Sequence, residues 1–212
     1  MTSVQRLLKI ASNQLSLDAC SASESNRLPV ELHKLLTSRN GFVAFESALV
    51  VFPSTRFDEV PGVIEWNDLN GWKRHYLDVL PKESICFAQD AFGDQFAISK
   101  SCILRMNSET GTVQEYSDSI EGWAERILEN YMADTGWPLA HEWQVLHGPL
   151  SPHMRLLPRI PFVLGGEFDE SNLVAVESQS AMEFLGRLYQ AIREVPDGQP
   201  ITILDWFREN GT

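Results

Sequence analysis

Cysteine is scarce in this sequence, with three residues in 212. Cys20, Cys86 and Cys102 are odd in number and form no C-x-x-C pair, which argues against a disulfide scaffold. Cys86 and Cys102 stand in apolar, strand-like runs, where a free thiol behaves as a small hydrophobic side chain. This cysteine usage favours a reducing compartment, and we expect a cytoplasmic protein.

Long apolar runs are also missing. No stretch approaches the ~20 apolar residues that cross a bilayer. The N-terminal stretch MTSVQRLLKIASNQL carries charged side chains inside its apolar run, so it lacks the core of a signal peptide. We therefore expect neither a membrane anchor nor a membrane partner.

Positive charge is the third shortage. The chain has 17 basic and 29 acidic residues, a net charge of −12, and no lysine follows Lys100. Nucleic acids and anionic membranes both require a basic face, so this balance argues against them as partners. It permits a basic protein partner, although ordinary solubility explains the acidity equally well.

The common catalytic and metal-binding motifs are absent. The sequence has no G-x-S-x-G elbow, no H-E-x-x-H pair and no cysteine in a catalytic motif. His141, His147 and His153 are six residues apart, which separates neighbours by about 120° around a helix. The adjacent carboxylates Asp58 and Glu59 suit a solvated loop better than an acid–base pair. We expect no metal, no cofactor and no enzymatic activity.

What the sequence does contain is a hydrophobic fraction of 43% over 212 residues, enough for a buried core. Apolar residues at helical spacing predict helices over residues 4–15, 29–39, 119–131 and 181–189. Asp118, followed by Glu121, is the predicted cap of the third helix. Polar stretches predict loops at residues 20–27 and 148–166, and residues 60–76, with Trp66 and Trp72, have no clear periodicity.

Runs rich in β-formers predict the strands. They occupy residues 41–46, 48–54, 84–89, 95–99, 102–107, 112–116, 173–176 and 201–204. Short links without intervening helices predict an antiparallel meander between residues 42 and 116, not parallel βαβ units. The predicted class is α+β, an antiparallel sheet flanked by helices. We divide the chain into an N-terminal helix and loop (1–24), a core (25–135) and an α/β C-terminal extension packed on that core (136–212).

One stretch, CFAQDAFGDQFAI (residues 86–98), has acidic residues four apart around a Phe-Gly pair. A calcium loop requires more oxygen ligands and a closing bidentate acid, and Asp90 and Asp94 have no such companions. A phosphate loop requires glycines that open a helix, whereas Gln95 begins a strand. Gly93 supplies the freedom of a tight turn. The stretch therefore predicts a β-hairpin.

The order of these parts resembles the SUKH superfamily, which includes fungal cell-wall-assembly regulators and many bacterial immunity proteins. The resembling parts are Leu28-Pro29 opening a helix, Asn40-Gly41 ending it, the segment of Trp66 and Trp72, the hairpin, and the helix SIEGWAERILENYM. Together they cover residues 25–132. The stretch PRIPFVLGGEFDESNL from Pro158 also resembles a segment of longer members.

Within the hairpin, six residues hold the positions that the family fills with a strand, an acidic-glycine turn and an aromatic strand. They are Phe87, Ala88, Asp90, Gly93, Asp94 and Phe96. The resemblance implies a non-catalytic immunity protein that neutralises a bacterial toxin by direct binding. The alternatives are a regulatory or scaffolding member of the same superfamily and, third, an unrecognised hydrolase.

A toxin that cuts nucleic acid carries a basic cleft, so an acidic face would suit it. We expect that face where loops at one end of the sheet converge. Its predicted residues are Asp58, Glu59, Glu65, Asp68, Trp72 and Asp90. For the tryptophans two interpretations stay open: a hot spot for binding, or core that covers one end of the sheet.

Overall fold

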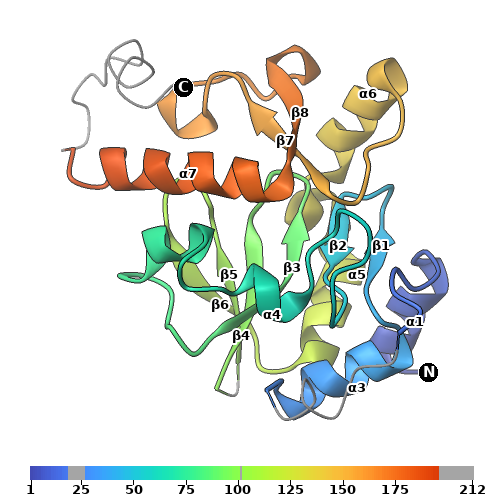
Figure 1. Ribbon diagram of the computed structural model, residues 1–212. Helices are drawn as coiled ribbons and strands as arrows, with labels where there is room; N and C mark the ends of the chain where they lie inside the picture. Colours follow the sequence, from blue (N-terminus) through green and yellow to red (C-terminus); the bar gives the residue numbers. More distant parts are fainter. Residues whose placement is uncertain (19–26, 101, 196–212) are drawn as a thin grey trace.

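The computed structural model describes residues 1–18, 27–100 and 102–195. They form a six-stranded antiparallel sheet with helices on both faces and a second, two-stranded sheet (Figure 1). The predicted α+β class is therefore confirmed. Within these ranges, no helix combines the length and the apolar content needed to cross a membrane.

The large sheet is a meander, because each strand pairs with the next one along the chain. The four strands predicted between residues 84 and 116 begin and end within one residue of the observed bounds. The strands are β1 (Phe42–Ala44), β2 (Leu49–Val51), β3 (Ile85–Asp90), β4 (Gln95–Ser99), β5 (Cys102–Met106) and β6 (Val113–Ser117).

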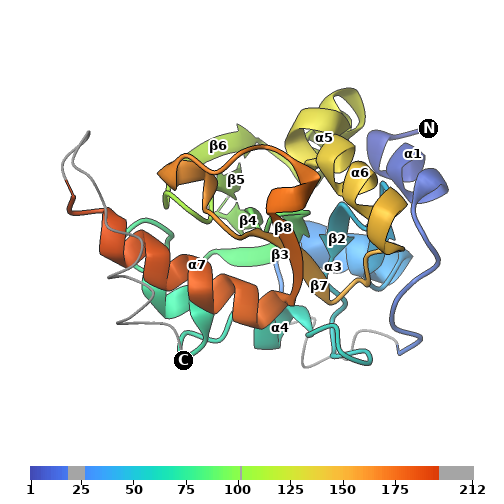
Figure 2. The same ribbon diagram turned by 90° about the horizontal axis from the view of Figure 1, so that it is seen from above.

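Helix α5 (Ile120–Thr135) covers one face of this sheet (Figure 2). The ring of Trp123 packs edge-on against Phe87 and Phe96, with ring centroids 5.1 and 6.0 Å apart. Both phenylalanines are fully buried, as the alternation of the hairpin predicted. Large aromatic rings supply much of the apolar area that a core buries, so these contacts anchor α5 to the hairpin.

The start of α5 differs from the prediction. Its cap is Ser119, whose hydroxyl accepts the Gly122 N–H at 3.1 Å, and not Asp118. Glu121 does not close a capping box. Its carboxylate accepts backbone N–H groups at the start of α1 (Ser3–Ile10) and so ties that helix to α5. Helix α1 is shorter than predicted, while the second predicted helix forms as α3 (Val30–Ser38), directly after Pro29.

The opposite face is covered by aromatic residues from the segment that had no clear periodicity. Trp72 lies between Trp66 and Tyr76, with ring centroids 5.4 and 5.8 Å away, and Tyr76 stacks on Tyr189 at 5.2 Å. Both tryptophans are buried, so the core interpretation of these rings is the correct one. The elements on this face are α4 (Val63–Trp66), the 3-10 helix η1 (Trp72–Tyr76) and α7 (Ser178–Ile192).

The C-terminal extension contains a helix and a strand that the sequence did not predict, together with two short 3-10 helices. Residues 137–147 form a helix, and a strand lies inside the stretch predicted as a loop. That strand pairs with the strand predicted at 173–176 across an intervening segment, so its partner is not visible in local periodicity. The elements are α6 (Trp137–His147), β7 (Met154–Pro158), η2 (Phe162–Leu164), η3 (Glu170–Asn172) and β8 (Leu173–Glu177). The strand predicted at 201–204 lies outside the described residues.

The extension packs on the core, as predicted. The stripe on α7 is buried at Ala181, Leu185, Leu188 and Tyr189 and half-buried at Phe184. The Leu156 N–H of β7 donates to the Ala91 carbonyl at 2.8 Å, directly after β3. Main-chain and apolar contacts therefore join the two parts.

The turn between β1 and β2 is backbone-strained. Phe45, Glu46 and Ser47 have φ values of 51°, 55° and 64°, three consecutive left-handed residues without a glycine. The extension holds this turn: Trp137 Nε1 donates to the Glu46 carboxylate at 3.0 Å, and Arg155 donates to the Ser47 carbonyl at 3.0 Å.

Candidate functional site

The β3–β4 hairpin is closed by a buried carboxylate. Asp90 Oδ1 accepts the backbone N–H groups of Phe92 and Asp94, both at 2.9 Å. Gly93 has φ +91°, a conformation that favours glycine, and an added Cβ would lie 3.2 Å from Met182 Sδ. The hairpin prediction is confirmed, and Asp90 acts as its internal cap.

Asp94 joins this hairpin to the next one. Its Oδ1 accepts the Ser108 N–H at 2.9 Å and the Ser108 hydroxyl at 3.1 Å, and Asn107 Nδ2 lies 3.2 Å from either oxygen. Ser108 and Asn107 belong to the turn between β5 and β6. The two turns therefore lie side by side at the same end of the sheet.

Arg105 of β5 balances part of the negative charge. Its Nη2 lies 3.3 Å from Asp90 Oδ2 and 3.4 Å from Asp94 Oδ2, and its Nη1 lies 2.9 Å from Asp134 Oδ1. Tyr116 donates its hydroxyl to the other oxygen of Asp134 at 2.6 Å. Burial, followed by the charge of Asp94, raises the pKa of Asp90, although Arg105 and the two N–H groups oppose that rise.

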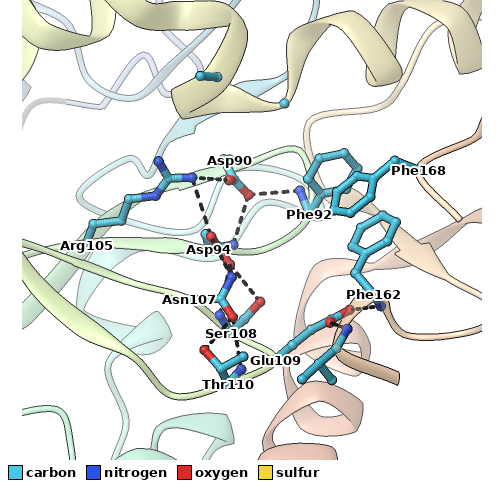
Figure 3. A pocket seen from close by; sticks show the side chains of 13 residues that line it. Asp90, Phe92, Asp94, Arg105, Asn107, Ser108, Glu109, Thr110, Phe162 and Phe168 are labelled. Atoms are coloured by element: carbon cyan, nitrogen blue, oxygen red, sulfur yellow. Dashed lines mark hydrogen bonds and ion pairs between the residues drawn. The ribbon is translucent and has the colours of Figure 1, made fainter. Parts of the chain in front are cut away.

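Beside this network is a cavity of about 310 Å³. We call it the Asp–Phe cavity, and it lies between the β3–β4 turn, the β5–β6 turn, the end of α5 and residues 162–168. Figure 3 shows Asp90, Asp94 and Arg105 on one side of it and three phenylalanine rings on the other, with Glu109 beside Phe162. Its volume is at the lower end of the range for ligand sites, ~300–1,000 Å³.

The phenylalanine wall is a row of rings. Phe92 meets Phe162 edge-on with centroids 5.5 Å apart, and Phe162 stacks on Phe168 at 4.0 Å. Phe168 is 74% exposed. Gly136, at the end of α5, leaves room for the Phe92 ring, because an added Cβ would lie 2.3 Å from it.

Glu109 fixes the phenylalanine wall to the sheet. This residue of the β5–β6 turn accepts the N–H groups of Phe162 and Val163 at 3.1 and 2.7 Å. The side chain is buried, and burial raises its pKa against the effect of the two hydrogen bonds. The loop that carries Phe162 is thus held by a carboxylate from the six-stranded sheet.

The cavity is better equipped for binding than for chemistry. Neither histidine nor cysteine lines it, and the Ser108 hydroxyl donates to Asp94. Asp90 has both oxygens engaged and is 2% exposed. Among the described residues, no group of three histidine, cysteine or acidic side chains is arranged to hold a metal.

Four of the six predicted face residues are exposed: Asp58, Glu59, Glu65 and Asp68. Glu65 pairs with Arg56, and Glu59 Oε2 lies 2.9 Å from His153 Nε2. Asp58 has φ +52°, a conformation that aspartate tolerates better than most residues. None of the four lines the Asp–Phe cavity.

The predicted face also included Trp72 and Asp90, and the expectation that these two lie on it is wrong. Trp72 is 1% exposed, because η1 turns its ring onto the sheet. Asp90 is buried because its carboxylate closes the hairpin. Neither is available as a surface contact.

The three histidines have separate surroundings. His141 Nδ1 lies 2.7 Å from Glu46 Oε2, His153 pairs with Glu59, and His147 packs on the Trp143 ring with centroids 4.7 Å apart. Contacts with three different partners agree with the interpretation that the six-residue spacing does not build a common site.

Sequence reasoning missed Arg105, Asn107, Glu109, Phe162 and Phe168 as site residues. The predicted meander contained enough information to find the first three. In a meander, alternate turns lie at the same end of the sheet, so the turn at residues 90–94 and the turn at 107–111 must be neighbours. Nothing local in the sequence indicated that Phe162 and Phe168 would join them.

Comparisons with known proteins support the fold and give no information on function. No protein-family model matches the chain, and no curated protein matches it. A crystal structure of Atu4351 from Agrobacterium tumefaciens is similar, with a TM-score of 0.59 and 16% sequence identity over 87% of each chain. At this identity, the likeness extends to the α+β architecture and not to function.

Proposed function

We propose that this chain is a non-catalytic protein-binding module, an immunity protein that neutralises a basic bacterial toxin domain by direct binding. The observation that carries the proposal is the Asp–Phe cavity. Its acidic groups are used in internal hydrogen bonds, while exposed Phe168 and Val163 form a solvent-facing wall. Exposed aromatic side chains beside a rigid polar network are typical of protein-binding surfaces.

The order of elements supports the immunity assignment over an unrelated binding role. The meander, the acidic-glycine turn of the β3–β4 hairpin and the helix that follows β6 occur in the sequence of parts on which the SUKH resemblance rests. The charge of −12 suits a basic partner. The same features fit a regulatory or scaffolding member of that superfamily, and the partner distinguishes the two.

A hydrolase is less well supported. A buried carboxylate with a raised pKa beside a cavity is a typical candidate for acid–base catalysis. Asp90, however, holds two backbone N–H groups on one oxygen and Arg105 on the other. A proton donor or acceptor must reach its substrate within hydrogen-bond distance, and Asp90 is enclosed by its own turn.

The experiment is co-expression with the toxin-like protein of the neighbouring gene. We expect rescue of growth and a complex that co-purifies. Two variants sharpen it: Val163→Lys places a cation at the mouth of the Asp–Phe cavity, and Val145→Lys makes the same change on the exposed side of α6. Val163→Lys should weaken the complex while Val145→Lys should not. Failure of every neighbouring candidate to bind would contradict the immunity function.

A further inference from the structure

The Asp–Phe cavity has walls of two kinds, and their combination limits what it can hold. One side presents Asp90 and Asp94 around a single guanidinium, that of Arg105, while the Glu109 carboxylate lies beside Phe162. The opposite side presents Phe92, Phe162 and Phe168. A cation finds attraction on both sides, because carboxylates and the faces of aromatic rings carry negative potential.

Other occupants fit less well. The carboxylates repel an anion, and an apolar side chain would leave the polar wall without solvent. A metal ion requires several free oxygen ligands, but the oxygens of Asp90 and Glu109 already accept N–H groups. A planar cation with several donors meets both walls, because it stacks on a ring and still donates to oxygens.

The edge of the cavity extends the negative charge outward. Glu167 and Asp169 flank Phe168 in sequence, and all three side chains are exposed. One face of the Phe168 ring stacks on Phe162. With 74% of Phe168 exposed, the rest of the ring is open to a partner.

We propose that the Asp–Phe cavity receives an arginine side chain presented by a loop of the protein partner. Its guanidinium stacks on Phe168 and is attracted by the negative charge of Asp94, whose oxygens remain bound to Ser108, Asn107 and Arg105. This inference rests on the proposed binding function and deepens it, since it names the side chain that the partner inserts. Arg105 supports the site from behind by holding Asp90 and Asp94 in place.

A small probe tests the site without the partner. The full-length, isotope-labelled chain is titrated with N-acetyl-arginine amide while its backbone amide NMR signals are followed. We expect saturable shifts confined to the β3–β4 turn, the β5–β6 turn and residues 162–168. N-acetyl-citrulline amide, similar in shape but uncharged, should cause none.

Two variants make the test specific. Phe168→Ala removes an exposed ring and should weaken probe binding by about five-fold, the magnitude of an exposed cation–π contact. Val163→Lys should abolish binding by charge repulsion, while its matched control Val145→Lys should bind as the unmodified chain does. Glu109 and Asp94 hold the turns together, so they are not altered here.

Several outcomes would overturn the inference. They are the absence of saturable shifts, equal shifts with the citrulline amide, shifts scattered over the surface, or binding that survives Val163→Lys. Equal binding of N-acetyl-lysine amide would overturn the preference for a guanidinium. The probe does not involve the toxin, so a partner that binds normally to Val163→Lys refutes this inference while the binding function stands.

Discussion

Arg155 of β7 donates a hydrogen bond to the main-chain carbonyl of Asp90 at 3.1 Å, and this bond joins the C-terminal extension to the β3–β4 hairpin. The guanidinium is fully buried and donates to three main-chain carbonyls, those of Ser47, Asp90 and Pro152. Burial lowers the pKa of Arg155 to about 9. Through these carbonyls, Arg155 joins the β1–β2 turn, the β3–β4 hairpin and the residues just before β7.

Arg155→Ala should lower the free energy of unfolding by about 2–4 kcal/mol, because it leaves buried carbonyls without donors. Arg159→Ala, four residues along and exposed, is the control and should stay within about 0.5 kcal/mol of the unmodified chain. Urea denaturation measures both. Equal stabilities would mean that Arg155 does not fasten the extension.

Gly93→Val should cost about 1–3 kcal/mol, because a β-branched residue is strained at φ +91°. Gly148 has nearly the same φ, +92°, but an added Cβ there meets nothing within 4 Å. Gly148→Val therefore measures the backbone strain alone. The additional loss in Gly93→Val reports the contact with Met182, and thermal unfolding of both variants gives the difference.

Trp72→Ala should act on stability, with a loss of about 3–5 kcal/mol, as for a buried aromatic side chain. Its buried indole N–H has no hydrogen-bond partner among the described residues, so Trp72→Phe should be far milder. Phe168→Ala, at an exposed ring, is the contrasting variant. A stable Trp72→Ala chain would argue against the packing around η1.

Asp90 should make stability fall as pH rises. Its pKa is raised from 3.8 to about 8 in the folded chain, so the folded state binds the proton more tightly than the unfolded state. Stability is then lost between about pH 4 and pH 8, by at most ~1.4 kcal/mol per pH unit. Asp94, Arg105 and Asp134 face the same network.

Asp90→Asn should flatten this pH dependence, whatever it does to the stability at a single pH. Glu142→Gln, which removes one carboxylate from the exposed side of α6, should leave the slope in place. Unfolding free energies measured across that range decide the matter. A slope unchanged by Asp90→Asn would assign the proton uptake to another group.

The exposed carboxylates Asp58 and Glu59 are expected to act on association. Asp58→Asn with Glu59→Lys should slow binding to a basic toxin and weaken its dependence on ionic strength, with little change in dissociation. Asparagine is chosen at position 58 because it accepts φ +52°. Association and dissociation rate constants at two salt concentrations test this. An unchanged association rate would show that these residues do not steer the partner.

The sheet was predictable because its signals are local. Alternating residues and turn glycines define a hairpin within a dozen positions, as Phe87, Gly93 and Phe96 do here. The helix α5 was predictable for the same reason, since Trp123 and Ile127 lie on one face. Its cap was misplaced by one residue, because Asp118 and Ser119 are both competent caps and only the geometry selects between them.

The candidate site depended on contacts that no local pattern encodes. Glu109 binds Phe162 and Val163 across more than fifty residues, and β7 becomes a strand only beside β8. The prediction for Trp72 was wrong because polar neighbours in the sequence do not make a residue exposed in the structure. Lys73, its neighbour, is itself buried and donates to the Asn67 side chain and the Ser84 carbonyl.

The left-handed turn at Phe45–Glu46–Ser47 has a consequence for synthesis. Its supports lie between 91 and 108 residues further along the chain, in α6 and β7. A ribosome releases β1 and β2 long before it makes these partners, and contacts of such long range form late. The strained backbone of the β1–β2 turn therefore stays unsupported until residue 155 has emerged, so a chain interrupted earlier lacks the contacts that hold this turn.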